Sequence, residues 1–308
     1  MAKKKFREVR STGFGSNVKN ESERLISKSG KFNIKKEGLT FFEQFNLFHS
    51  LITMSAIPFF ICLMIGFFLI NLFFTGAYLL IGLENLEGTS VNNDFFDAFY
   101  FSAQTLTTVG YGGLYPTGKV ISLIASLEAF IGLLGFAVST GLLYGRFSKP
   151  KPKIMFSKNA LLSPYQDIKG LMVRVANPKK NQLINISAKM MYSQIEETEG
   201  NKTRKFYPLD LEIDQINLFV TSWTIVHPIN TESPLYNLSH KDIKERKGEL
   251  ILLLSAYDES YSQNLHARTS YKPEEIIKNA KFIPVSGLND EEQSIIYLNK
   301  LDEYEIIK

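Results

Sequence analysis

The sequence predicts an α+β membrane protein with two transmembrane helices and a β-rich C-terminal domain. Residues 57–81 contain no charged side chain, and residues 120–147 carry a single carboxylate, Glu128, before their basic end. Each stretch is long enough to cross a bilayer as a helix. From residue 154 onward the pattern changes to short runs rich in β-branched and aromatic residues. The mean hydropathy of −0.05 over 308 residues therefore averages an apolar half and a polar half.

The placement of charge predicts how the chain is oriented in the membrane. Lys and Arg are frequent before residue 37 and again from Arg146 to Lys153, whereas the loop between the two apolar stretches has acids and no base before Lys119. Because basic residues concentrate on the cytoplasmic side, we expect a multi-pass protein with both termini in the cytoplasm. The formal net charge of +4 is modest, so we expect no nucleic-acid partner.

An amphipathic segment precedes the first span. Apolar side chains recur in it at helical spacing, which predicts an interfacial helix lying on the inner leaflet. The residues that form this apolar face are Phe41, Phe45, Phe48 and Ile52.

Residues 93–107 are too short to cross a bilayer but carry apolar and aromatic side chains on several faces. Asn93 or Asp94 is available as the N-cap of a helix. We interpret this segment as a re-entrant helix, because helices that stop inside the membrane are tolerated only where protein or water surrounds their ends.

The string T-V-G-Y-G directly follows this segment at residues 108–112. It is the known filter signature of potassium channels, in which backbone carbonyls replace the hydration shell of the ion. The glycines allow positive φ at alternate positions, so that successive carbonyls can turn to one side of the chain. The sequence thus predicts potassium ions held by Thr108, Val109, Gly110 and Tyr111, with Gly112 completing the filter and no other cofactor.

Glu128 lies in the outer third of the second span, where a carboxylate is expensive and is therefore functional or paired. It either braces the filter from behind or faces the pore and attracts ions, and we favour the brace. Gly132, Gly135 and Gly141 are costly inside a helix. Close helix approach would explain them, whereas bending would make one of them a hinge.

Three residues one helical turn apart, Phe136, Thr140 and Tyr144, can share the face of the second span that turns to the pore axis. Large rings at a narrow crossing can gate conduction by excluding water. The alternative is that these rings pack against the first span. In the first span Asn71 is the strongly polar residue, and we expect a buried interhelical hydrogen bond there rather than a role in conduction.

The C-terminal half predicts an antiparallel β-sandwich of immunoglobulin-like type, with a short helix at 239–246 that Ser239 can cap. We expect a basic cytoplasmic segment at 1–40, an interfacial helix and two-helix pore domain at 41–149, and the sandwich at 150–308. No nucleotide-binding or catalytic motif is present, and the single cysteine, Cys62, lies in the first span, so no enzyme is predicted. The expected strands are 154–162, 171–176, 183–192, 205–211, 218–227, 249–256, 265–271 and 280–285.

From residue 45 to residue 285 the chain resembles the prokaryotic inward-rectifier potassium channels of the KirBac type. The filter alone indicates only a potassium channel, and the cytoplasmic strings are more specific. The matching strings are Phe45-Asn46-Leu47-Phe48-His49, Ser126-Leu127-Glu128, Ser139-Thr140-Gly141-Leu142, Arg146-Phe147-Ser148-Lys149-Pro150, Ile154-Met155-Phe156, Ser222-Trp223-Thr224-Ile225-Val226-His227-Pro228, Ser233-Pro234-Leu235-Tyr236 and His266-Ala267-Arg268-Thr269-Ser270-Tyr271.

The resemblance implies a homotetramer in the bacterial inner membrane, with a cytoplasmic vestibule that Glu259 would line. It implies gating at the inner helix bundle, with Tyr144 at the family's aromatic gate position and Gly132 at its hinge. A response to anionic lipid headgroups would map onto basic residues that also suit this binding by charge. These are Arg146, Lys149, Lys151 and Lys153.

The chain departs from the family at three places. Gln104 stands in the pore helix where Glu is usual, so filter support is expected from Gln104 and Glu128 together. Gly113 and Leu114 follow the filter where charged partners are common. Phe136 stands where strong rectifiers carry an acid that draws polyamines and magnesium into the pore, so these potential blockers are expected to act weakly.

The function predicted from the sequence is a potassium-selective, weakly rectifying, tetrameric channel gated by the cytoplasmic domain and anionic lipid. The alternative is a membrane-tethered binding or scaffold module with a non-conducting pore, which the departures at Gln104 and the outer mouth motivate. Ion flux separates the two functions.

Overall fold

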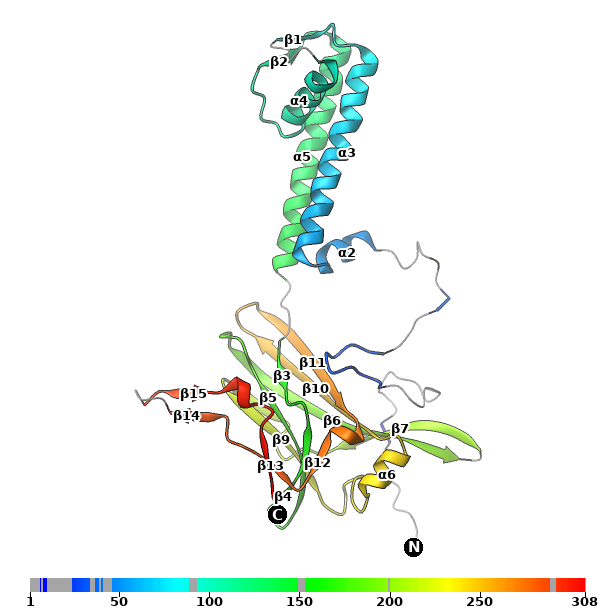
Figure 1. The fold of residues 1–308 in the computed structure, drawn as a ribbon, viewed down its shortest axis with the longest axis vertical. Coiled ribbons are helices and arrows are strands. Elements are labelled where there is room, and N and C mark those ends of the chain that lie inside the picture. The colour runs from blue at the N-terminus through cyan, green and yellow to red at the C-terminus, as the bar shows by residue number, and fades with distance from the viewer. Residues whose placement is uncertain are drawn as a thin grey trace. The chain divides into compact units, whose positions relative to one another are not determined.

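The computed structural model describes residues 6, 8–9, 24–33, 37–38, 40, 46–88, 93–148, 153–198, 200–288 and 292–307. Contacts divide the chain into two compact units (Figure 1). We call Glu37–Lys149 the helical unit, and Met1–Lys36 with Pro150–Lys308 the sandwich unit. The described residues 24–33 therefore group with the C-terminal domain.

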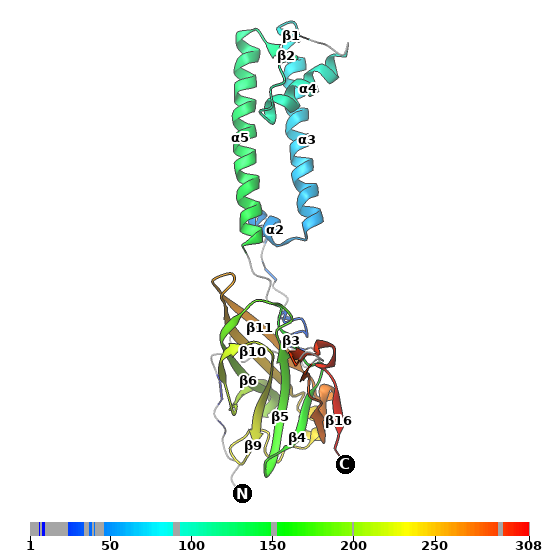
Figure 2. The ribbon, with the colours of Figure 1, turned by 90° about the vertical axis from the view of Figure 1, so that its left-hand side faces the viewer.

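The helical unit contains both expected spans. They are α3 (Ala56–Ile81) and α5 (Lys119–Phe147), each long and apolar enough to cross a membrane. Between them, α4 (Asp94–Leu106) packs against both (Figure 2). Asn93 caps α4 by accepting a hydrogen bond from the N–H of Phe96 at 3.2 Å, which confirms one of the two predicted caps.

A helix is observed at this place as α2 (Leu47–Thr53), capped by Asn46, whose side chain accepts from the N–H of His49 at 2.9 Å. Phe48 is exposed and Ile52 is buried. Phe41 and Phe45, which were expected on the same apolar face, lie outside the described residues.

A two-stranded sheet that the sequence did not predict joins the loop before α4 to the loop after the filter segment. Strand β1 (Leu86–Gly88) pairs antiparallel with β2 (Leu114–Pro116), which follows the filter. Gly88 has φ of +129°, and a Cβ there would lie 1.9 Å from the carbonyl oxygen of Gly113. Only glycine allows this approach, so Gly88 joins the segment before α4 to the segment after the filter.

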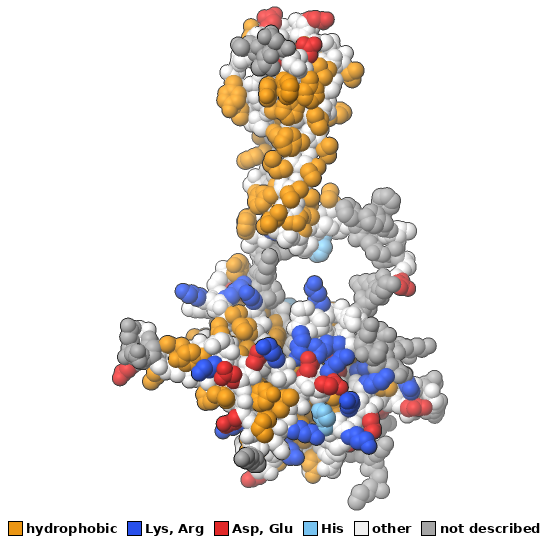
Figure 3. All heavy atoms as spheres, in the orientation of Figure 1, with side chains coloured by type: hydrophobic (Ala, Val, Ile, Leu, Met, Phe, Trp, Pro, Cys, Tyr) orange, Lys and Arg blue, Asp and Glu red, His pale blue; other side chains and the backbone are white. Residues whose placement is uncertain are grey.

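On the face shown in Figure 3, apolar side chains are frequent along the helical unit, and acidic side chains lie at the end that carries β1 and β2. Phe73 and Leu80 on α3 are 71% and 90% exposed in the single chain. Many exposed large apolar side chains on one part of a protein mark contact with lipid or with another subunit. The prediction of a membrane protein is thereby supported by where the apolar groups lie as well as by their number.

The sandwich unit is built on two five-stranded sheets. The first has the order β11-β10-β6-β7, with β8 also paired to β6, and the second has the order β12-β4-β5-β3, with β9 also paired to β5. Their strands are β3 (Met155–Phe156), β4 (Ala160–Tyr165), β5 (Ile168–Ala176), β6 (Leu183–Thr198), β7 (Asn201–Leu209), β8 (Gln215–Phe219), β9 (Ser222–Ile229), β10 (Glu249–Asp258), β11 (Gln263–Tyr271) and β12 (Ile276–Lys278).

Alternating residues of the two sheets meet in one core. Val173 and Ile225 from one sheet, with Ile186 and Leu252 from the other, are completely buried there. This inward alternation is what packs two antiparallel sheets face to face, so the predicted sandwich is confirmed.

Two expected strands were wrong in extent, because each is interrupted. The 218–227 run is β8 and β9, which belong to different sheets, so the chain changes sheet at residues 220–221. The 154–162 run is β3 and β4, separated where Ser157 donates to the carbonyl of Asn159 at 2.8 Å. A change of sheet leaves the local β pattern intact, so periodicity does not detect it.

The expected strand at 280–285 is observed over three residues as β13 (Ala280–Phe282), which pairs with β16 (Tyr304–Ile306) outside the two main sheets. Other short elements near the C-terminus were not predicted, because three-residue strands carry too little periodicity to be seen in sequence. They are β16, β14 (Ser286–Leu288) paired with β15 (Ser294–Ile296), and the 3₁₀ turns η1 (Pro273–Glu275) and η2 (Leu298–Lys300).

The predicted short helix is α6 (His240–Glu245), capped by Ser239 as expected. His227 is buried on β9. Its Nδ1 lies 2.6 Å from the carbonyl of Asp210 and its Nε2 lies 2.7 Å from the hydroxyl of Ser233. A carbonyl only accepts, so Nδ1 carries the proton, and burial lowers the pKa of this imidazole.

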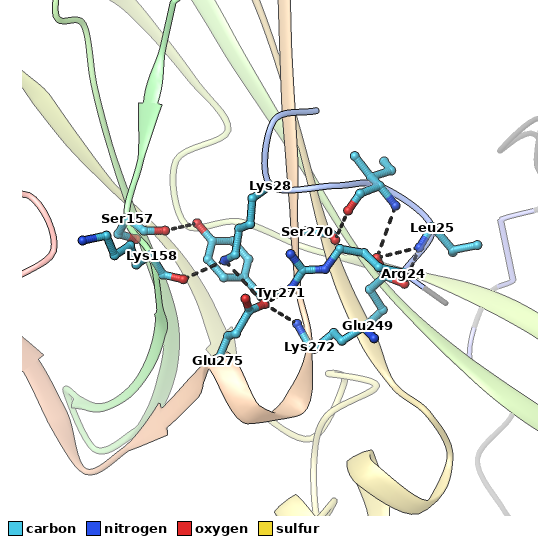
Figure 4. A network of polar contacts seen from close by, with 11 residues as sticks. Arg24, Leu25, Lys28, Ser157, Lys158, Glu249, Ser270, Tyr271, Lys272 and Glu275 are labelled. Atoms are coloured by element: carbon cyan, nitrogen blue, oxygen red, sulfur yellow. Dashed lines mark hydrogen bonds and ion pairs between the residues drawn. The ribbon is translucent and has the colours of Figure 1, made fainter. Parts of the chain in front are cut away.

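Residues 24–33, which we call the N-terminal clip, dock on the outer face of the first sheet (Figure 4). Leu25 and Ile26 are buried against Phe206 of β7 and Ile251 of β10. The backbone N–H of Leu25 donates to both oxygens of the Glu249 carboxylate, at 3.1 and 3.0 Å. Glu249 is only 3% exposed, so a buried charge is satisfied largely by backbone groups of the clip.

Side chains of β11 and η1 hold the rest of the clip. The Ser270 hydroxyl donates to the carbonyl of Ile26 at 2.5 Å, and Arg268 donates to the carbonyl of Gly30 at 2.8 Å. Arg24 pairs with Glu275, and the Lys28 ammonium lies 3.8 Å from the centre of the Tyr271 ring (Figure 4). Burial lowers the pKa of Lys28, while Glu275 acts in the opposite direction.

We predict that Glu249→Ala loosens the clip. The N–H groups of Leu25 and Ile26 lose their acceptor, so amide hydrogen exchange across 24–33 becomes faster and the sandwich unit loses about 1–3 kcal/mol of stability. Glu245→Ala is the matched control, because that side chain is 64% exposed and only 3.8 Å from Lys241 in a surface pair. Equal exchange rates in the two variants would contradict the assignment.

Candidate functional site

The T-V-G-Y-G segment has the backbone that its sequence predicts. Thr108, Gly110 and Gly112 have φ of +58°, +57° and +78°, and the residues between them do not have positive φ. Alternation of left-handed and right-handed residues turns successive carbonyls to the same side of the chain. The segment can therefore present a row of uncharged oxygens, which is the ligand set that a dehydrated cation requires.

The end of α4 holds the start of this segment. The carbonyl of Gln104 accepts from the N–H of Val109 at 3.0 Å and from the N–H of Gly110 at 3.4 Å. The hydroxyl of Thr107 donates back to the carbonyl of Ala103 at 2.7 Å. These bonds fold the filter segment against the last turn of the helix, so any shift of α4 moves the segment with it.

Behind the filter segment, Glu128 of α5 is completely buried and lies between two hydroxyl groups. The Tyr78 hydroxyl of α3 is 2.5 Å from its Oε2, and the Ser102 hydroxyl of α4 is 2.5 Å from its Oε1. Of the two interpretations of Glu128, this geometry favours the brace, because the carboxyl is enclosed within one chain. Its place at the junction of three helices suits a residue that fixes α4.

Asn71 of α3 extends the same group of contacts, and the predicted interhelical hydrogen bond is confirmed. The Asn71 side chain is completely buried and donates from Nδ2 to the carbonyl of Phe67 at 2.8 Å. Its Oδ1 lies 3.1 Å from the Ser102 hydroxyl. Thr75, one turn further along α3, donates to the Asn71 carbonyl at 2.7 Å.

Sequence reasoning missed Tyr78 and Ser102. Each is an ordinary residue in its own helix, and nothing in the local pattern distinguishes it. The available signal was Glu128 itself, since a carboxyl at that depth requires hydroxyl or amide donors on the neighbouring helices.

Gly132 lies where α4 and α5 approach each other closely. A Cβ at this position would lie 1.9 Å from the carbonyl oxygen of Leu106, the last residue of α4. Apart from the neighbouring backbone of α5 itself, no atom of the described residues lies within 4 Å of a Cβ built at Gly135 or Gly141. Close helix approach therefore explains Gly132, whereas the other two glycines have no such contact within one chain.

Phe136, Thr140 and Tyr144 are exposed in the single chain. Phe136 and Tyr144 are 73% and 76% exposed, and the Thr140 hydroxyl donates to the carbonyl of Phe136 at 2.9 Å. Neither ring is buried against α3, which was the alternative considered for them. The face they occupy is available to other subunits or to a pore.

The basic residues expected to bind lipid are divided between the two units. Arg146, at the end of α5, lies 3.4 Å from the carbonyl of Leu51 and 5.2 Å from the centre of the Phe59 ring. Lys153 is exposed in the sandwich unit. Lys149 and Lys151 lie outside the described residues. Glu259 is exposed in the turn between β10 and β11.

Comparison with known proteins identifies the family of the chain. Residues 154–308 match the inward rectifier potassium channel C-terminal domain, and residues 65–149 match an ion-channel family model. The chain is 34% identical over 285 residues to the inward rectifier potassium channel Kirbac3.1 of Paramagnetospirillum magnetotacticum, covering 91% of this chain and 95% of that protein.

Two animal relatives match over a smaller part. The chain is 28% identical over 236 residues to the G protein-activated inward rectifier potassium channel 4 of Mus musculus, covering 72% of this chain and 54% of that protein. It is 31% identical over 212 residues to the G protein-activated inward rectifier potassium channel 1 of Bos taurus, covering 64% and 41%. The chain thus spans about half the length of these two relatives.

The fold and the filter segment define a membrane ion channel rather than an enzyme. The chain belongs to the inward rectifier potassium channel family and is of the prokaryotic KirBac type. The family predicted from the sequence is confirmed.

We predict that Gly132→Ala disrupts the junction of α4 and α5. The added methyl group cannot share space with the Leu106 carbonyl, so the helices must separate, at a cost of about 1–3 kcal/mol. Gly135→Ala, three residues away, has room within the chain and should change stability by less than about 1 kcal/mol. Thermal melting of the two purified variants in detergent makes the comparison, and equal losses would show that Gly132 is not the constrained position.

Proposed function

We propose that this chain is one quarter of a homotetrameric, potassium-selective channel whose filter is Thr108 to Gly112. The observation that carries the proposal is the alternation of φ along T-V-G-Y-G, held at the end of a re-entrant helix between two spans. One chain supplies carbonyls on one side of the ion only. A ring of such carbonyls therefore requires several copies, and four is the number used by potassium filters.

The bonds between α4 and its neighbours are proposed to support the filter. Gln104 acts through its backbone carbonyl, so this role does not depend on the carboxylate that the family usually has there. Glu128 acts from behind as a brace. The C-terminal end of α4 also carries the negative end of a helix dipole, which favours a cation near it.

The inner part of the conduction path is proposed to be lined by Phe136, Thr140 and Tyr144. Four copies of the Tyr144 ring at the narrow end of the spans would exclude water and close the pore. Bending of α5 at Gly132 would then move these rings apart. Because Gly132 lies close to the carbonyl of Leu106, a bend at Gly132 would also displace the end of α4, from which the filter segment starts.

The sandwich unit is proposed to gate the pore from the cytoplasm. It is joined to α5 through the linker that begins at Lys149, and Glu259 would line the vestibule below the pore. The basic residues around this linker, namely Arg146, Lys149, Lys151 and Lys153, would bind anionic lipid headgroups of the bacterial inner membrane. Both termini would lie in the cytoplasm.

Cation flux into liposomes tests this function. Purified protein in vesicles of varied anionic lipid content should take up rubidium and potassium, and sodium at a much lower rate. Tyr144→Ala should raise the uptake severalfold, because the smaller side chain leaves the inner crossing wet. Equal sodium and potassium uptake would refute selectivity, and a folded tetramer that never conducts in any lipid would favour the scaffold function.

We predict weak block by spermine and magnesium, because Phe136 supplies no negative charge inside the pore. Phe136→Asp should lower the half-blocking spermine concentration by about tenfold or more, which corresponds to ~1.4 kcal/mol of added binding. Phe136→Asn is the control for the change in size and polarity without charge. Planar-bilayer recording measures the block, and strong micromolar block of the unchanged protein would show the prediction wrong.

A further inference from the structure

The buried Glu128 carboxyl has no basic partner among the residues that the structure describes. Its contacts are the Tyr78 and Ser102 hydroxyls, and none of the observed ion pairs includes it. An isolated carboxylate inside a membrane protein costs several kcal/mol, and such a group normally takes up a proton or finds a cation. No described Lys, Arg or His meets this need, so the position of the proton has to be found from the hydrogen bonds.

The orientation of the Asn71 amide is fixed by a neighbour that can only accept. Asn71 Nδ2 lies 2.8 Å from the Phe67 carbonyl, and reversing the amide would place two oxygens face to face there. The oxygen Oδ1 therefore faces the Ser102 hydroxyl at 3.1 Å. The Asn71 carbonyl oxygen lies 3.2 Å from the same hydroxyl.

Ser102 thus has acceptors on both sides and one proton to give. If Glu128 were ionised, the Ser102 proton could serve either Oε1 of Glu128 or the oxygens of Asn71. The other contact would then bring two lone pairs together in a buried site without a proton between them. The 2.5 Å distances suit an ionised carboxylate and a carboxylic acid equally. The protonation state of Glu128 therefore has to be inferred from the number of protons that these contacts need.

A proton on Oε1 of Glu128 removes this conflict. Glu128 then donates to Ser102, Ser102 donates to Asn71, and Tyr78 donates to Oε2 of Glu128. Every one of these contacts becomes a hydrogen bond, and no charge remains in the apolar interior. Fully satisfied buried networks of this kind fix one arrangement of the helices that carry them.

We propose that Glu128 is a neutral carboxylic acid in the folded protein and a hydrogen-bond donor to Ser102, so that Tyr78, Ser102 and Asn71 are positioning residues for the filter. The inference rests on the proposed role of Glu128 in filter support and gives that role its chemistry. The brace then acts through directed hydrogen bonds, and not as a fixed charge that would attract ions.

The network acts on the filter through α4. Ser102 contacts Glu128, and one turn later Leu106 contacts Gly132, one turn beyond Glu128 on α5. The two helices therefore run in the same direction through two contacts in matching register. Gln104, whose carbonyl holds Val109 and Gly110, lies between these contacts on α4. Loss of the contact between Ser102 and Glu128 would therefore tilt the turn of α4 from which the filter starts.

Infrared difference spectroscopy of the full-length protein in lipid at neutral pH tests the proton directly. Wild type minus Glu128→Gln should show the carbonyl stretch of an unionised carboxylic acid, and this band should shift in deuterium oxide. In case Glu128→Gln fails to fold, wild type labelled with carbon-13 at its glutamate carboxyl groups should show the same band shifted by the label. Absence of a protonated carboxyl band would overturn the proposal.

Selectivity of flux tests the positioning role. Glutamine can donate from Nε2 to Ser102 and accept from Tyr78, so Glu128→Gln should keep the potassium-to-sodium flux ratio within about twofold of wild type. Glu128→Ala should lower it by about tenfold or more. Equal loss in both variants would show that the ionised form is needed and would refute the neutral brace. Wild type that shows the acid band but no selective flux would instead refute the proposed function.

Discussion

The junction of α4 and α5 is the constraint on which the rest of the helical unit depends. The C-terminal carbonyl of α4 occupies the space that a side chain at position 132 would need, so this contact exists only because that residue is glycine. The last turn of α4 in turn holds the first amides of the filter segment. A change in the distance between α4 and α5 at this point would therefore move the carbonyls that would bind the ion. One turn away, Glu128 and Ser102 set the same spacing with a polar contact, so steric and hydrogen-bonded restraints act together.

The two units differ in where their polar and apolar side chains lie. In the helical unit many large apolar side chains of α3 and α5 are exposed, whereas the polar side chains of Asn71, Ser102 and Glu128 are completely buried. In the sandwich unit the core between the two sheets is apolar, and the buried carboxylate of Glu249 lies outside that core, where the backbone of the N-terminal clip donates to it. The first arrangement suits a lipid solvent and the second suits water. The N-terminal clip also explains why residues 24–33 group with the C-terminal domain although they precede both spans in the chain.

Exposure in a single chain is informative about assembly. Tyr111 of the filter segment is 85% exposed, and the rings of Phe136 and Tyr144 are exposed to a similar degree. The chain nevertheless belongs to a family of potassium channels. A filter whose residues stand open on one side is incomplete as an ion site and needs further copies. The proposed tetramer supplies these copies and would bury the same surfaces.

The sequence by itself determined the two spans, the re-entrant helix with its Asn93 cap, the filter segment and the β-rich C-terminal half. Each of these depends on local order: an uncharged run, a capping residue before an apolar segment, glycines at alternate positions, or period-two alternation. Only the tertiary structure decided that Tyr78 and Ser102 meet Glu128, that Gly132 receives the carbonyl of Leu106, that β8 and β9 lie in different sheets, and that the clip docks on Glu249. These features are contacts between residues 26 to 224 positions apart, or a change of strand partner within one β-rich run. A local sequence pattern does not indicate which distant residue will pack beside it.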